Sequence, residues 1–98
     1  MKIRKLTAMP YAQAHIETDE EMNHTLFSYV TRVAELDNEG WLTIFGLYSM
    51  TTRKHISAFL REYCPMVDYQ TAKQIYNDGY RINVMTGEVV PVEDEELA

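Results

Sequence analysis

The chain has 98 residues, of which 46% are hydrophobic and 24% are charged, and its formal net charge is −6. This composition is typical of one globular domain, and a net negative surface disfavours binding to a phosphate backbone. No apolar run is long enough to span a membrane, and the N-terminal segment lacks the apolar stretch of a secretory signal peptide. Because Cys64 is the only cysteine, no intrachain disulfide can form, and we expect a cytoplasmic protein.

Residues 1–16 predict a short strand or an irregular arm, since Pro10 breaks helical hydrogen bonding. Further along, Thr18 and Glu21 have the spacing of a helix capping box. This spacing predicts one turn of helix over residues 21–24.

The stretch from Leu26 to Tyr48 predicts a β-hairpin. A β-rich run covers residues 26–34, turn-forming residues fill 37–40, and a second β-rich run covers 41–48. Large apolar residues occupy both faces of both strands, so both faces need to be covered. Helices would cover one face. The N-terminal arm or a second subunit would cover the other, so a homo-oligomer stays open.

Two helices are predicted after the hairpin. The first covers Thr52–Tyr63 and ends before Pro65, because the residue before a proline avoids helical geometry. The second runs from about residue 68 to Asn77, and Gly79 suits the stop that follows it. The apolar stripes consist of Ile56, Phe59, Leu60 and Tyr63 in the first helix and Ala72, Ile75 and Tyr76 in the second.

The C-terminal part predicts two short strands around residues 86–87, and Pro91 confines the second strand to an edge. Together these elements predict a single α+β domain over residues 1–92. Its antiparallel sheet would be built on the central β-hairpin and packed against one main and one shorter helix. Residues 93–98 form an acidic tail, for which we expect disorder.

The turn before the first helix is the best candidate for a ligand site. Free backbone N–H groups at a helix N-terminus attract anions, and hydroxyl and basic side chains beside them would add donors. The same hydroxyls are ordinary helix caps, so capping alone also explains them. The candidate residues for binding a small anion or a nucleotide are Ser49, Thr51, Thr52, Arg53, Lys54 and His55.

Two acidic blocks form the candidate partner-binding surface. Such blocks either stay solvated and keep a protein soluble, or they meet a basic partner and imitate a nucleic acid. The seven tyrosines also favour an interface, since tyrosine buries a large area at low entropic cost. The acidic residues are Glu17, Asp19, Glu20 and Glu21 in the first block and Glu93, Asp94, Glu95 and Glu96 in the second.

The sequence predicts no catalytic residue, no metal site and no cofactor. His55 has no nucleophile or carboxylate at a fixed spacing, so a packed histidine is the expected alternative. His15, His24 and Cys64 add no metal-ligand spacing. Cys64 also follows the C-terminus of the first helix, where the helix dipole does not activate a thiol, so we expect it to be inert.

Part of the chain resembles an uncharacterised family of small proteins from phages and mobile elements. The resemblance lies in the pattern LFSY-x-T-x-VA at residues 26–34 and the pattern G-x-YS-x-TT-x-x-HI-x-x-FL at residues 46–60. It implies a context and no activity, since the family has none established. Small acidic proteins of this origin often act by binding a host protein.

We therefore expect a non-enzymatic binding module that contacts a host or phage protein. The most specific version of this hypothesis is that the protein inhibits a host defence or nucleic-acid-handling protein. One alternative is a small-anion or nucleotide-binding module at residues 49–55. The other is a nucleic-acid-binding accessory protein, which the net negative charge disfavours. That protein would use Lys2, Arg4, Lys5, Arg53 and Lys54.

Overall fold

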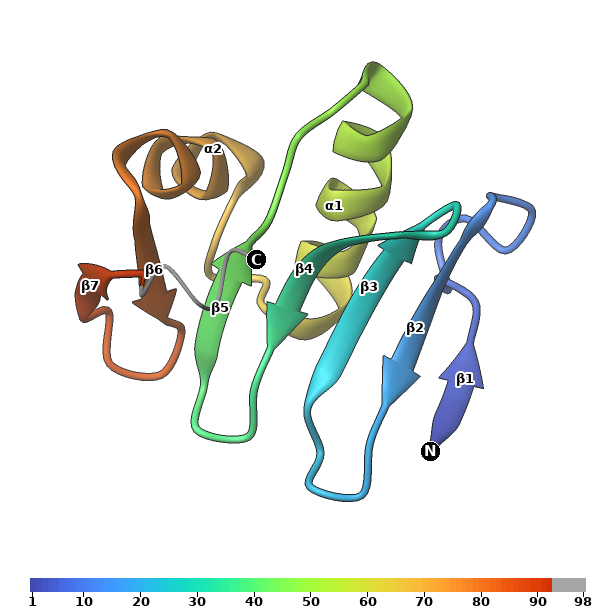
Figure 1. Cartoon of the computed structure of the whole chain (residues 1–98), viewed down its shortest axis with the longest axis horizontal. Helices are drawn as coiled ribbons and strands as arrows, with labels where there is room; N and C mark the ends of the chain where they lie inside the picture. Colours follow the sequence, from blue (N-terminus) through green and yellow to red (C-terminus); the bar gives the residue numbers. More distant parts are fainter. Residues whose placement is uncertain (93–98) are drawn as a thin grey trace.

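A computed structural model describes residues 1–92, which form a seven-stranded antiparallel sheet and two helices (Figure 1). The predicted α+β class is confirmed. The strands lie in the sheet in the order of the chain, so every strand pairs with its neighbours in sequence. The strands are β1 (Lys2–Arg4), β2 (Ala14–Thr18), β3 (His24–Ser28), β4 (Thr31–Leu36), β5 (Trp41–Ile44), β6 (Tyr80–Asn83) and β7 (Val89–Pro91). The helices are α1 (Met50–Tyr63) and α2 (Tyr69–Asp78), and both lie between β5 and β6.

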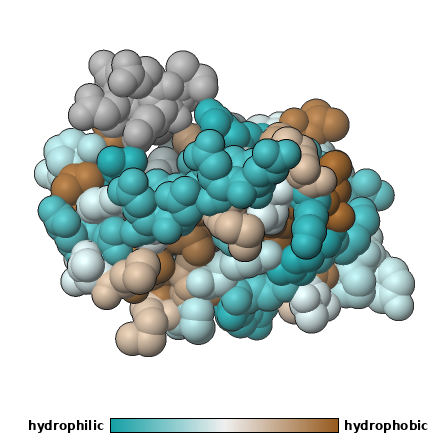
Figure 2. Space-filling model, turned by 90° about the horizontal axis from the view of Figure 1, so that it is seen from below, coloured by the Kyte–Doolittle hydropathy of each residue, from teal (hydrophilic) through white to brown (hydrophobic). Residues whose placement is uncertain are grey.

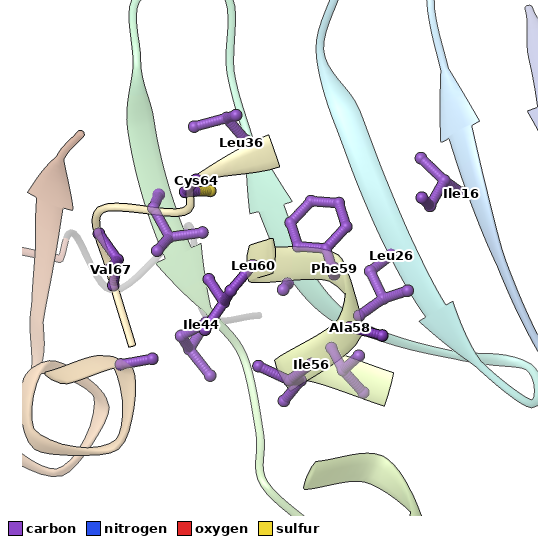
Figure 3. Packing of buried hydrophobic residues seen from close by; sticks show 14 of the residues in the cluster. Ile16, Leu26, Leu36, Ile44, Ile56, Ala58, Phe59, Leu60, Cys64 and Val67 are labelled. Atoms are coloured by element: carbon purple, nitrogen blue, oxygen red, sulfur yellow. The ribbon is translucent and has the colours of Figure 1, made fainter. Parts of the chain in front are cut away.

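Both helices pack on the same side of the sheet. α1 contacts β3 and β4, α2 contacts β5 and β6, and in the view of Figure 1 α1 passes behind the sheet. The core lies between the two layers, where strand residues meet the apolar stripe of α1 (Figure 3). Phe59 has no exposed surface. The labelled residues of this core include Ile16, Leu26, Leu36 and Ile44 from the strands and Ile56, Phe59 and Leu60 from α1.

The helix ends follow local capping chemistry. Ser49 caps α1 by accepting a hydrogen bond from the backbone N–H of Thr52, so the helix begins two residues before the predicted start. Asp68 caps α2 in the same way, through the N–H of Thr71. Gly79 ends α2 with φ +77°, a left-handed conformation that glycine adopts without steric cost.

The predicted strand over residues 26–34 is wrong, because the chain reverses in its middle. β3 ends at Ser28, Tyr29 has φ +59°, and β4 begins at Thr31. The backbone N–H of Tyr29 donates to the carbonyl of Gln13, the residue before β2, with an N···O distance of 2.6 Å. The reversal therefore depends on β2, a strand that the predicted arm over residues 1–16 did not separate from β1.

The predicted helical turn over residues 21–24 is also wrong. Residues 19–23 form the reverse turn between β2 and β3, in which Met22 has φ +68°. The Asp19 carboxylate accepts hydrogen bonds from the N–H groups of Glu21 and Asn23, at 2.9 and 3.0 Å. An acidic cap is present, but it closes a β-turn and starts no helix.

Candidate functional site

One face of the sheet carries no described helix, and we call it the open face. Side chains alternate along each strand, so the neighbours of core residues point to this other side. The register places Glu17, Thr25, Glu35 and Thr43 side by side across four strands. The open face consists of His15, Glu17, Thr25, Phe27, Arg32, Glu35, Trp41, Thr43, Phe45 and Arg81, and of these Thr43 is buried.

Aromatic rings on the open face stack with other rings and with cations. His15 lies parallel to Phe27, with ring centroids 4.9 Å apart. The guanidinium carbon of Arg32 lies 4.0 Å from the centroid of Phe45. That of Arg81 lies 4.8 Å from Trp41, the only tryptophan in the chain. These contacts favour the observed positions of the side chains.

The same face carries carboxylates. Glu17 lies 2.9 Å from the ring Nε2 of His15. Burial raises the pKa of Glu35 above its ordinary value, although the neighbouring Arg32 opposes the shift. A cationic group placed against this half-buried carboxyl would stabilise its charged form.

The acidic block before β3 lies at one end of the open face. Two turns, residues 19–23 and 37–40, are joined there by hydrogen bonds from the backbone N–H and side-chain amide of Asn38, each 2.9 Å long. Figure 2 views the molecule from this end, where the surface is mainly hydrophilic. We call it the acidic end, and its residues are Asp19, Glu20, Glu21, Asp37 and Glu39. The second predicted block, residues 93–96, lies outside the described residues.

The structure divides the predicted anion site of residues 49–55 into two parts. Thr52 and His55 are buried, and Ser49 is the helix cap. Thr51 is exposed at the start of α1. Arg53 and Lys54 are exposed and line a groove of about 410 Å³ on the helix side. We call this pocket the basic groove, and its principal residues are Arg53, Lys54, Ser57, Arg61, Met9 and Tyr69.

The other cations proposed for nucleic-acid contact lie elsewhere. Lys2 and Arg4 line a pocket of about 460 Å³ together with Asp19 and Glu20. The guanidinium of Arg4 is paired with Glu62 at 2.8 Å. These cations are thus mixed with acids, whereas Arg53 and Lys54 have no acid in their groove.

A buried polar cluster joins β3 to α1. Ser28 Oγ lies 2.8 Å from His55 Nδ1 and 3.3 Å from the hydroxyl of Thr52. A serine beside a histidine is the pairing of a nucleophile with a base. Here Ser28 is 3% exposed and His55 is 1% exposed. A substrate would not reach either group, and the cluster serves to attach α1 to the sheet.

Burial also governs Cys64, whose pKa it raises to about 11. A thiol with such a pKa carries almost no thiolate at neutral pH. Among residues 1–92, no three histidine, cysteine or acidic side chains are grouped so that they could hold a metal ion. Within the same range, no helix is both long and apolar enough to cross a membrane.

The stability of the fold is expected to fall as the pH is lowered from 7.5 to 5.5. Burial lowers the pKa of His55, and burial with the charge of Arg4 lowers that of His24. The unfolded chain therefore takes up protons near pH 6.5, before the folded chain does, and protonation favours unfolding. The urea concentration at which half of the protein is unfolded, measured at three pH values, checks this prediction. Burial raises the pKa of Glu35, and its protonation acts in the opposite direction. A midpoint concentration that rises toward pH 5.5 would therefore contradict the prediction that the two histidines dominate.

Fold and site together define a small α+β protein in which both described helices cover one side of an antiparallel sheet. The other side is the aromatic open face, and the basic groove lies on the helix side. The model of a family of unknown function, DUF8033, matches residues 1–84, so the chain belongs to this family. The expected membership of an uncharacterised family is confirmed at this level. No curated protein and no solved structure matches the chain.

Proposed function

We propose that the protein is a non-enzymatic binding module that acts by protein–protein contact through the open face. The observation that supports this is the composition of the face, where Phe27, Trp41 and Phe45 stand beside two stacked arginines. Aromatic residues and arginine are enriched at the energetic centres of protein interfaces. Side chains whose positions these contacts already favour would lose less entropy on binding.

The acidic end indicates the chemistry of the partner. It adjoins the open face at Glu17 and Glu35, so a partner that covers the face would also meet five acids. A basic rim on the partner would match this charge and speed the encounter at low salt. A second copy of the chain, with its own charge of −6, fits less well, because two like-charged surfaces repel each other.

The resemblance of residues 26–60 to phage and mobile-element proteins extends the proposal to a host protein. A basic surface that meets an acidic one is typical of proteins that handle nucleic acids. The protein would then occupy the nucleic-acid path of a host defence or nucleic-acid-handling protein and inhibit it. Support for this extension comes from the resemblance and from the acidic end.

The test is capture of the partner from lysate of the source cell by tagged wild type and by variants of the two surfaces. Phe27→Ala removes one stacked ring of the open face, and the double variant Glu20→Lys, Glu21→Lys reverses charge at the acidic end. Asp78→Lys is the matched control, because it reverses one exposed charge on α2. Circular dichroism shows that each variant is folded.

We expect a stoichiometric partner that is captured by wild type and by the control. Loss of an interface anchor costs about 2 kcal/mol or more, so Phe27→Ala should weaken binding roughly thirtyfold. The charge reversal should slow association most at low salt. Equal capture by all variants would refute the proposed surface. A concentration-dependent dimer that Phe27→Ala dissociates would show that the face binds a second copy instead.

A further inference from the structure

The basic groove on the helix side differs in chemistry from the rest of the molecule. Arg53, Lys54 and Arg61 are exposed along α1, and none of the residues lining the groove is acidic. Within residues 1–92 no ion pair joins any of the three cations to an acid. Glu62, the acid next in sequence, is bonded to Arg4 and Thr7. Three cations without counter-charges create a local positive potential on a chain of charge −6.

The spacing of these residues forms one line along the helix. Arg53, Ser57 and Arg61 follow one another at four-residue intervals, which places them on one side of α1. At 1.5 Å per residue, the line from Arg53 to Arg61 is about 12 Å long. Donors are therefore distributed over the length of a small molecule. The volume of about 410 Å³ lies in the range of small-ligand sites, roughly 300–1,000 Å³.

The hydroxyl of Tyr69 is unpaired and lies beside the groove. Tyr69 lines the groove at the start of α2, and its hydroxyl is sheltered from solvent without any hydrogen-bond partner. A buried polar group left unpaired is costly, and such groups are rare in native proteins. Because this oxygen has no exposed surface, an acceptor oxygen of a bound molecule would reach it only after the ring turns toward the groove. The three cations therefore carry the proposal, and the hydroxyl would be an added contact, which the Tyr69→Phe variant tests.

We propose that the basic groove binds a small anion that carries two or more phosphate groups. Guanidinium groups bind phosphate through paired N–H donors, and Lys54 adds a point charge. A compact polyphosphate has enough charge to meet three cations over this length. A long nucleic acid is disfavoured, because beyond the groove it would approach a molecule that is acidic overall. The groove takes Arg53 and Lys54 from the predicted anion site but uses neither the helix cap nor His55.

The experiment is a titration of the whole chain with inorganic tripolyphosphate and with ATP at low salt, followed by amide NMR shifts and calorimetry. Arg61→Gln and Arg53→Gln each remove one charge from the groove. Lys2→Gln removes one charge from β1 and is the matched control. Tyr69→Phe removes only the unpaired hydroxyl. All four side chains are exposed or half-buried, and thermal melts confirm that the variants fold.

We expect amide shifts over residues 53–61 and at Tyr69, and binding that each arginine variant weakens about tenfold or more. The Lys2→Gln control should bind within twofold of wild type. Tyr69→Phe should weaken binding several-fold while it raises the Tm of the free protein, because the unpaired hydroxyl is gone. A purely structural tyrosine would not change binding.

Three results would overturn the proposal. The first is the absence of shifts in the groove at millimolar tripolyphosphate. The second is equal weakening by Lys2→Gln and Arg61→Gln, which would mean diffuse attraction without a site. The third is tight binding of a single-stranded oligonucleotide that tripolyphosphate does not displace, which would assign the groove to nucleic acid. None of these results bears on the open face, so the two proposals stand or fall separately.

Discussion

Replacement of Phe59 by alanine is expected to lower the free energy of unfolding by about 3–5 kcal/mol. The ring is fully buried between α1 and the sheet (Figure 3) and lies 5.1 Å from the ring of Tyr63. Its removal loses apolar burial and leaves a cavity that neighbouring side chains fill only in part. A domain of this size is stable by only about 5–15 kcal/mol, so the variant should be close to unfolding.

Urea denaturation of wild type and Phe59→Ala measures the difference. Met66→Ala is the control, because Met66 is 87% exposed, and a surface change of this kind stays within about 0.5 kcal/mol. A loss below about 1 kcal/mol for Phe59→Ala would mean that α1 does not pack on the sheet as described.

The second large effect is expected at the buried cluster of Ser28 and His55. Loss of the imidazole in His55→Ala creates a cavity and leaves the hydroxyl of Ser28 without its 2.8 Å partner. We expect a loss of about 2–5 kcal/mol, similar to truncation of other large buried side chains. Ser28→Ala removes the partner alone and should cost about 1–3 kcal/mol, because a ring nitrogen then stays unpaired in the core.

A double-mutant cycle on Ser28 and His55 separates this hydrogen bond from simple loss of packing. Residues in one network show coupling energies of about 0.5–3 kcal/mol, whereas independent sites add. The sum of the losses of unfolding free energy in the two single variants should therefore exceed the loss in the double variant. Strict additivity would mean that the two side chains do not interact, contrary to the position of β3 against α1.

The helices were predictable from the sequence because their signals are local. The apolar stripe of α1, the stop before Pro65 and Gly79 after α2 each depend on neighbours within a few residues. The turn at Tyr29 was not predictable in the same way. No glycine or asparagine marks it, and tyrosine and valine favour strands. Its conformation is held by the bond to Gln13 in a different part of the chain.

The candidate sites also divide into features that are local in the sequence and features that depend on distant residues. The acidic block at residues 17–21 was visible as a run, and Arg53 and Lys54 were visible beside a helix start. The open face was missed because its residues come one or two at a time from five strands, and a misplaced strand changes which side chains share a side. Arg61 and Tyr69 were missed because the groove joins α1 to α2. The alternation of Trp41, Thr43 and Phe45 was the signal that could have revealed the face.

The proposed interface can be tested by fluorine NMR of the chain labelled with 5-fluorotryptophan, before and after addition of unlabelled partner. Trp41 is the only tryptophan and lies on the open face, so one resonance reports on that surface. We predict that this resonance shifts and becomes less accessible to a soluble quencher when the complex forms. An unchanged and equally accessible resonance in a fully formed complex would show that the partner binds elsewhere and would refute binding through the open face.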